Sequence, residues 1–407
     1  MDIRTTKAQH LDPNWNILSP LINDRTDFEK QKSHDNVYYN LYDFYMGIRK
    51  YKTEEMPLMT LYYENFKRKE PLFPSDEDRT LFFKSERNKG NFVPNTKEQL
   101  KGVIQVVKNA TFKMFYDCGF RSNVEYFSET RRANRHYRIL APMIIPMGYL
   151  FQHFYDGTLP KLVQAWEILR RPEVTVLLER PFHKNIFLLL TKFNITNERI
   201  VWHRRSDYVT VYSADYLIFA CIAPPLHPVL WKQGRRFLGV PDRITVPKNE
   251  ATIMLLTRAG AVNPGRRIHN KRNVIDYLAS RYKERLIVFD AKYNLEEAIK
   301  VFSKTSIIIG THGGALYNMN YASLDVAVIE YVPVTKTGYD IPALPHAIFW
   351  AISDLTGQKY WRVQAYPANH VNDMVIDIPK LTKMLDIIDP ETKNSVNKHN
   401  EDNLLIN

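Results

Sequence analysis

The stretch SIIIGTHGGALYNMNYA, residues 306–322, joins a β-branched apolar run to a helix-like apolar run through a turn that contains one histidine and two glycines. Similar runs lie on either side of it: TIMLLTR, NVIDYLASRY, RLIVFD and LEEAIKVFSK precede it, and VAVIEYV follows it. Short apolar strands that alternate with helices are typical of βαβ units and a parallel sheet. The sequence therefore predicts an α/β domain over residues 246–388.

The preceding part of the chain predicts a second α/β domain, over residues 101–245. Here PEVTVLLE, RIVWH and YLIFACIA read as strands, and NIFLLLTKF and HPVLWKQGRRFLGV read as helices. The segment GVPDRITVPKNE, which carries prolines and charges, separates the two patterns. Residues 1–100 read as a polar N-terminal extension, and residues 389–407 as a mobile polar tail. A chain of this length holds about two domains of roughly 150 residues each, so we expect two doubly wound domains with a cleft between them.

The composition indicates a basic protein. Lysine and arginine total 56 against 44 acidic residues, for a formal net charge of +12. Such a surface attracts nucleotides, nucleic acid, phosphosugars or acidic lipids, and the charge alone does not choose among them. The two cysteines, Cys118 and Cys221, allow one disulfide but form neither a disulfide framework nor a zinc site. No signal-peptide core and no run of about 20 apolar residues is present, so we expect either a soluble cytosolic protein or one whose N-terminal anchor is missing from this sequence.

The GTHGG turn follows a predicted strand, and ligands of parallel α/β sheets bind beyond the carboxyl ends of the strands. Glycines let backbone N–H groups approach a ligand closely, and the start of the next helix offers free N–H groups and a partial positive charge. This arrangement suits a diphosphate, to which His312 adds a hydrogen bond or a charge. The spacing differs from G-x-G-x-x-G, which disfavours NAD. An ordinary tight turn with a surface histidine is an equally good interpretation of these residues alone.

A second phosphate-suited patch is LLTRAGAVNPGRRIHN, where Arg258, Arg266 and Arg267 follow the end of a predicted strand. Arginine at such a place can hold a phosphate through two parallel hydrogen bonds. The alternative is a solvated basic loop. The presence of two such patches in one parallel sheet strengthens the interpretation of each as a phosphate site.

Three carboxylate positions complete the candidates. In FQHFYDGTLPKL, His153 and Asp156 are three residues apart and share a face if the segment is helical. Asp156 could serve there as a general base, although a helix cap by Asp156 beside an ordinary half-buried histidine is the simpler interpretation. Glu330 ends the run VAVIE and could bind ribose hydroxyls, or simply be a solvated strand end. The triplet Asp76-Glu77-Asp78 has the D-x-D form of metal-dependent transferases, but we interpret it as a chance match in the polar extension, far from the strand ends.

The segments FQHFYDGTLPKL, LLTRAGAVNPGRRIHN and IIIGTHGGALYNMNYASLDVAVIEYVP, in this order, resemble glycosyltransferase family 61, and FWAISDLTGQKYWRV is similar to its segment near the end of the second domain. The resemblance covers about residues 145–365. It implies a GT-B fold, in which two Rossmann-like domains face each other across a cleft. It also implies a metal-independent, inverting hexosyl- or pentosyltransferase that moves a sugar from a nucleotide-sugar, usually a UDP-sugar, to a protein or glycan hydroxyl in the endoplasmic reticulum or Golgi.

The resemblance assigns roles to individual residues. It implies donor binding by Arg258, Arg267, Asn270, His312, Gly313, Gly314, Ala315, Asn318 and Glu330. It implies Asp156 as the base, with His153 as the alternative, and no metal ligands. A nucleic-acid partner is not expected, and a membrane would be reached only through an N-terminal anchor. The competing hypothesis is a non-catalytic relative that binds a glycan or a protein.

Overall fold

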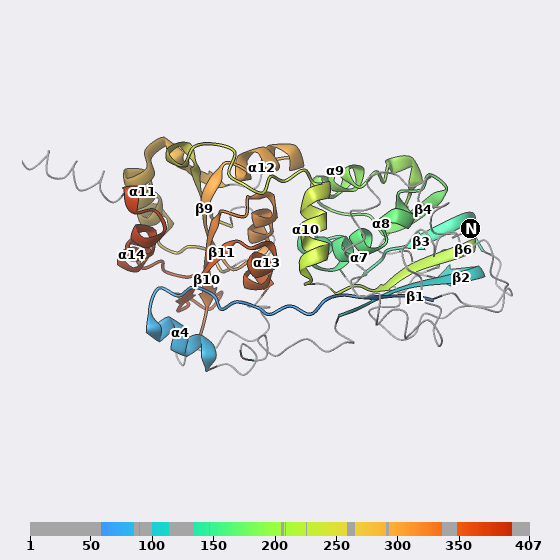
Figure 1. Cartoon of the computed structure of the whole chain (residues 1–407), viewed down its shortest axis with the longest axis horizontal. Helices are drawn as coiled ribbons and strands as arrows, with labels where there is room; N and C mark the ends of the chain where they lie inside the picture. Colours follow the sequence, from blue (N-terminus) through green and yellow to red (C-terminus); the bar gives the residue numbers. More distant parts are fainter. Residues whose placement is uncertain are drawn as a thin grey trace, which may run out of the picture. The chain divides into compact units, whose positions relative to one another are not determined.

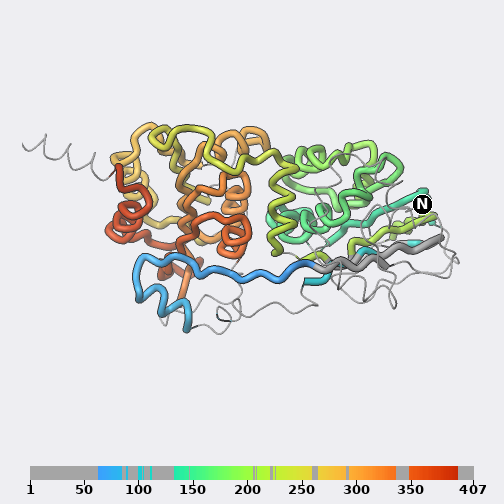
Figure 2. The backbone as a smooth tube through the Cα atoms, in the orientation of Figure 1, coloured from blue at the N-terminus to red at the C-terminus, as the bar shows by residue number. Residues whose placement is uncertain are grey.

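The structure is a computed structural model of the chain that describes residues 58–84, 89, 100–113, 133–145, 147–204, 207, 209–224, 226–258, 265–289, 293–335 and 348–392. These residues form two compact units, which Figures 1 and 2 colour along the sequence. The N-terminal unit holds the described residues up to Phe66 and those from Leu100 to Leu238. The C-terminal unit holds the described residues between Lys67 and Lys89 and those from Gly239 onward. Cys118 and most of the predicted tail lie outside the described residues.

The N-terminal unit is built on a six-stranded sheet with the order β1-β2-β6-β3-β4-β5. Its strands are β1 (Leu58–Tyr62), β2 (Lys101–Lys113), β3 (Arg135–Pro142), β4 (Val174–Glu179), β5 (Ile200–His203) and β6 (Val211–Ile222). Strands β6, β3, β4 and β5 are parallel, whereas β2 and β1 are added as an antiparallel pair at one edge. The helices are α6 (Phe151–His153), the π-helix η2 (Phe154–Thr158), α7 (Leu159–Gln164), α8 (Trp166–Leu169), α9 (Lys184–Lys192), η3 (Asn197–Arg199) and α10 (Pro228–Phe237). The parallel strands and helices predicted from PEVTVLLE to HPVLWKQGRRFLGV are therefore confirmed.

The C-terminal unit has five strands, all parallel, in the order β11-β10-β9-β7-β8. They are β7 (Thr252–Leu256), β8 (Leu286–Phe289), β9 (Thr305–Thr311), β10 (Ala327–Pro333) and β11 (Lys359–Ala365). The helices are α4 (Asp76–Phe83), η4 (Lys248–Glu250), α11 (Lys271–Tyr282), η5 (Lys283–Arg285), α12 (Leu295–Phe302), η6 (Gly314–Tyr321), α13 (Ile348–Thr356) and α14 (Ile378–Ile388). The order of the strands reverses between β7 and β9, which makes the carboxyl ends of these two strands the expected place for a ligand.

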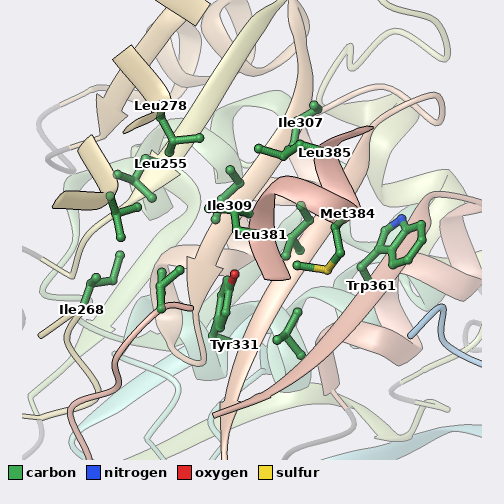
Figure 3. Packing of buried hydrophobic residues seen from close by; sticks show 14 of the residues in the cluster. Leu255, Ile268, Leu278, Ile307, Ile309, Tyr331, Trp361, Leu381, Met384 and Leu385 are labelled. Atoms are coloured by element: carbon green, nitrogen blue, oxygen red, sulfur yellow. The ribbon is translucent and has the colours of Figure 1, made fainter. Parts of the chain in front are cut away.

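The core of the C-terminal unit explains why its strands read as apolar runs. Side chains of β7, β9, β10 and β11 pack on one face against α11 and α14, and Figure 3 shows Leu381 and Met384 of α14 beside Ile309 and Trp361. Strands of a parallel sheet are covered on both faces, so few of their positions are polar. The buried charged residues of these strands, on the other face of β10 and β11, are Glu330 and Arg362.

One helix differs from the prediction. The run ALYNMNYA forms the 3₁₀-helix η6 rather than an α-helix. Its asparagines support the tighter winding, because Asn318 and Asn320 donate their side-chain N–H groups to the carbonyls of Ala315 and Tyr317, three residues back.

A segment of the predicted N-terminal extension belongs to the C-terminal unit. Leu72 bridges to β11: its N–H donates to the Tyr360 carbonyl at 2.8 Å, and its carbonyl accepts from the N–H of Arg362 at 2.9 Å. The Trp350 indole N–H donates to the Lys69 carbonyl at 2.9 Å, and Phe82 of α4 packs edge-on against the Trp350 ring. Residues 67–84 thus extend the edge of the sheet, which their polar sequence does not suggest.

The D-x-D triplet lies in this segment, as the first turn of α4. Asp78 is buried, pairs with Lys380 at 2.6 Å and accepts a hydrogen bond from Ser75 at 2.6 Å. Its other oxygen accepts from the backbone N–H of Gln364, near the carboxyl end of β11, at 3.4 Å. The expectation that the triplet lies far from the strand ends is therefore wrong, and its buried carboxylate has a structural role.

Candidate functional site

Two loops meet at the point where the strand order of the C-terminal sheet reverses. Thr257 and Arg258 follow β7, and His312 and Gly313 follow β9. The Arg258 guanidinium donates to the Gly265 carbonyl at 3.1 Å and to the His312 carbonyl at 3.3 Å. Both phosphate-suited patches of the sequence therefore form one site, which we call the arginine site (Arg258, Arg266, Arg267, His312 and Gly313).

Gly313 lets the Arg258 side chain lie directly against the backbone. A Cβ at this position would stand 1.7 Å from Arg258 Nη1. Gly265 is required for a different reason: its φ of +95° is in the left-handed region, and a Cβ there would stand 2.0 Å from the backbone oxygen of Val371.

Hydrogen bonds hold the segment of Arg266 and Arg267 in place. The Thr311 hydroxyl, at the end of β9, donates to the Arg266 carbonyl at 2.6 Å. The backbone N–H of Arg267 donates to Asp373 at 2.8 Å, and that of Arg266 donates to the Val371 carbonyl at 3.2 Å. Asp373 did not stand out in the sequence because it belongs to no recognisable motif, and Thr311, although part of the GTHGG turn, was assigned no role there.

The arginines repel one another in a partly buried place. Burial and the charges of Arg266 and Arg267 lower the pKa of Arg258 to about 10, an effect that Asp373 partly offsets. Burial also lowers the pKa of Arg266. Like charges held together away from water are unfavourable until an anion neutralises them. The electrostatics of the arginine site therefore favour a bound anion with more than one negative charge.

His312 is fixed by a buried carboxylate. Its Nδ1 lies 2.5 Å from Glu330 Oε1, and its ring packs edge-on against Phe349. The second Glu330 oxygen accepts from the Tyr360 hydroxyl. Glu330 is the fourth residue of β10 and is 0% exposed, so the prediction of a solvated strand end is wrong. Both of its oxygens have protein partners, and a ribose contact has no support in this geometry.

The remaining residues predicted to bind the donor support the loops around the site. The Asn270 amide exchanges two hydrogen bonds with the Ile376 backbone, at 2.8 and 2.9 Å. Gly314 begins η6, and the Ala315 carbonyl accepts from Asn318 at 2.7 Å. A direct contact between these residues and a ligand stays a prediction.

The two candidate bases are neighbours in the N-terminal unit. His153 Nδ1 lies 3.5 Å from Asp156 Oδ1, and the side chains are 34% and 24% exposed. His153 ends α6, and Asp156 lies within the π-helix η2 rather than at a helix cap. Single π-helical turns are frequent at functional sites. The predicted sharing of one face is confirmed, whereas the capping interpretation of Asp156 is wrong.

The hydrogen bond to Asp156 raises the pKa of His153 above 6.5, against the opposing effect of burial. Folding therefore favours the protonated imidazole. This contribution to stability is complete below the ordinary histidine pKa, and it disappears as the pH rises through the higher pKa of the folded protein. Because the pair is partly exposed, solvent screens the effect on stability.

We expect an NMR titration to give His153 a midpoint above 6.5, and Asp156→Asn to move that midpoint down. His153→Gln identifies the resonance by its loss. An unchanged His153 midpoint in Asp156→Asn would show that the carboxylate does not control this imidazole in solution.

Elsewhere, the described residues contain no group of three or more histidines, cysteines, aspartates or glutamates placed to hold a metal ion. None of the described helices has the length and apolar character needed to cross a membrane.

Residues 151–329 match the family described as Glycosyltransferase 61. The match begins just before the His153–Asp156 pair, includes the arginine site, and ends one residue before Glu330. Together with the α/β fold and the anion-suited site, this match supports glycosyltransferase activity. This segment of the chain is therefore similar to glycosyltransferase family 61, and the match supports membership of that family. A search among curated proteins found no match to the chain.

Proposed function

We propose that this protein is an inverting glycosyltransferase that moves a sugar from a UDP-sugar to a hydroxyl group of a protein or glycan. The arrangement that carries the proposal is the group of three arginines held beside Gly313 at the reversal of the strand order. Its charge and partial burial suit the diphosphate of a nucleotide-sugar. The reaction would take place in the endoplasmic reticulum or Golgi, where members of the family generally work.

The proposed reaction is a single in-line displacement. The acceptor oxygen forms a bond to the anomeric carbon as the bond from that carbon to the UDP oxygen breaks, and the electron pair of that bond leaves with UDP. Asp156 takes the proton of the acceptor hydroxyl. Arg258, Arg266 and Arg267 stabilise the negative charge that develops on the diphosphate. We propose that these side chains do so without a metal ion, and that the two units face each other in the GT-B manner so that both sites serve one reaction.

The test is a thermal-unfolding screen of the purified chain with UDP, GDP, CDP, UDP-GlcNAc and UDP-xylose, with Mn²⁺ or with EDTA. A ligand that binds only the folded state adds about 2.7 kcal/mol to the free energy of unfolding at one hundred times its dissociation constant. We expect UDP and one UDP-sugar to raise the unfolding temperature equally with Mn²⁺ and with EDTA. No shift with any nucleotide would contradict the proposed function, and a shift only with Mn²⁺ would contradict its metal independence.

A further inference from the structure

Behind His312, a chain of buried polar groups crosses two strands. Glu330 of β10 lies opposite Arg362 of β11 in the parallel register. The Tyr360 hydroxyl donates to Glu330 and accepts from Arg362. Glu330 and Arg362 are 0% exposed and Tyr360 is 4% exposed. The chain of contacts thus runs from Arg362 through Tyr360 and Glu330 to the imidazole of His312.

This network is costly in the interior of a parallel sheet. A buried carboxylate is tolerated only where opposite charge and hydrogen bonds compensate for its lost hydration. Tyr360 supplies a hydrogen bond to one oxygen of Glu330, Arg362 in turn donates to Tyr360, and the other Glu330 oxygen holds His312 of the arginine site. Hydrogen bonds in such a low-dielectric interior restrain the groups that make them.

An imidazole needs such support to present a defined nitrogen. The hydrogen bond made by one ring nitrogen decides which tautomer is present and how the ring is oriented. The Glu330 carboxylate can only accept, so it fixes the proton on Nδ1 of His312 and turns Nε2 away from itself. The Tyr360 hydroxyl also restrains the rotation of the Glu330 carboxylate. Without this hydroxyl, Glu330 Oε2 would have lost its donor in an interior that water does not reach.

We propose that Tyr360 is a positioning residue of the donor site: acting through Glu330, it fixes the ring plane and the Nδ1–H tautomer of His312, the residue whose backbone carbonyl accepts from Arg258. This role rests on the proposed function of the arginine site. Both Tyr360 and Glu330 lie beyond residues 151–329, which match the family. Tyr360 falls within FWAISDLTGQKYWRV, a stretch in which the sequence assigned no role to an individual residue.

The chain offers a matched control in Tyr331, the residue after Glu330. Tyr331 is also buried, and its hydroxyl makes no hydrogen bond within the described part of the chain. Tyr331→Phe and Tyr360→Phe therefore remove the same atom from adjacent strands of one sheet. Only the second change removes a partner of Glu330.

The experiment measures UDP affinity by calorimetry and the two ring nitrogens of His312 by ¹⁵N NMR, in the full chain and in both variants. His312→Gln assigns the resonances. We expect the wild type and Tyr331→Phe to show a protonated Nδ1 and equal UDP affinity. In Tyr360→Phe we expect the His312 nitrogens to move toward a mixture of tautomers and the UDP dissociation constant to rise about five- to tenfold, the usual loss for one hydrogen bond.

Each other outcome decides against the inference. The inference is overturned if Tyr360→Phe and Tyr331→Phe have the same UDP affinity and the same His312 nitrogen resonances. It is also overturned if Tyr360→Phe changes only the UDP affinity or only the His312 nitrogens. If the wild type binds no UDP, the proposed function fails, while the His312 nitrogens still show whether Tyr360 controls the ring. Should Tyr360→Phe not fold, Glu330→Gln removes the same restraint from His312, and unchanged His312 nitrogens in that variant would overturn the inference.

Discussion

Asparagine in place of Asp156 is expected to lower the kcat of sugar transfer by about 10²- to 10⁴-fold, the usual contribution of a general base. An amide has nearly the shape of the carboxylate but cannot accept the proton of the acceptor hydroxyl. UDP affinity should stay within about twofold of wild type, because the arginine site belongs to the other unit. A tenfold change in the dissociation constant would need a change of about 1.4 kcal/mol in the binding free energy. The measurement is initial-rate kinetics with the UDP-sugar found in the thermal screen, together with UDP calorimetry.

The chain provides a second histidine–aspartate pair as a control. His136 Nε2 lies 3.1 Å from Asp215 in the same unit, with both side chains more exposed than His153 and Asp156. Asp215→Asn should keep the wild-type kcat. If Asp156→Asn keeps it as well, Asp156 is not the base and His153→Gln becomes the decisive variant. A wild type that binds UDP but transfers no sugar to any acceptor would favour a non-catalytic relative.

The second large effect is expected from Arg258→Met, which should raise the UDP dissociation constant by about 10- to 100-fold, since hydrogen bonds to charged groups contribute about 1.5–3 kcal/mol. Methionine retains most of the packing of the arginine stem. We expect the free energy of unfolding not to fall, because relief of the repulsion by Arg266 and Arg267 offsets the two lost hydrogen bonds. A loss of binding without a loss of stability is typical of functional groups held in unfavourable surroundings.

Gly313→Ala tests the same contact without removing a charge. The new methyl group would have to displace Arg258 Nη1, the flexible end of the side chain, so the fold should persist while UDP binding weakens. Gly239→Ala is not a suitable control because its φ of +71° strains any side chain. Gly234→Ala, in α10, is the matched control: the nearest atom to its new Cβ would be Val163 Cγ2 at 3.6 Å, an ordinary contact, so UDP affinity should equal that of wild type. UDP affinity equal to wild type in Arg258→Met would contradict the assignment of the diphosphate to the arginine site.

The sequence predicts the α/β class well because parallel strands are covered on both faces and therefore appear as short apolar runs. The sequence also indicates that the two phosphate-suited patches lie at the same edge of the sheet, because the carboxyl ends of parallel strands share one edge. Two properties of Glu330 could not be predicted in this way. Its place inside β10 depends on where the strand ends, and its contact with Tyr360 depends on pairing with β11, since Tyr360 lies 30 residues later in the chain. No local sequence pattern encodes either of them.

Residues 67–84 show a second limit of sequence patterns. The segment has no long apolar run, and only a few of its side chains, such as Phe82 and Asp78, are buried. Its attachment to β11 depends on backbone hydrogen bonds and on pairs with Trp350, Arg362 and Lys380. Such contacts are set by the completed sheet, so composition alone predicts an extension.

The same attachment sets an order for folding during synthesis. Lys69 and Trp350, which share a hydrogen bond, are 281 residues apart in the chain. At roughly 5–20 residues per second, α4 leaves the ribosome about 15–55 s before its partners exist. Meanwhile Phe82 lacks its later-made neighbours Trp350 and Arg362, and chaperones bind exposed apolar side chains of this kind. The segment that forms one edge of the C-terminal unit is thus among the first described residues to be synthesised. A shortened chain that begins after residue 93 would lack this edge of the sheet.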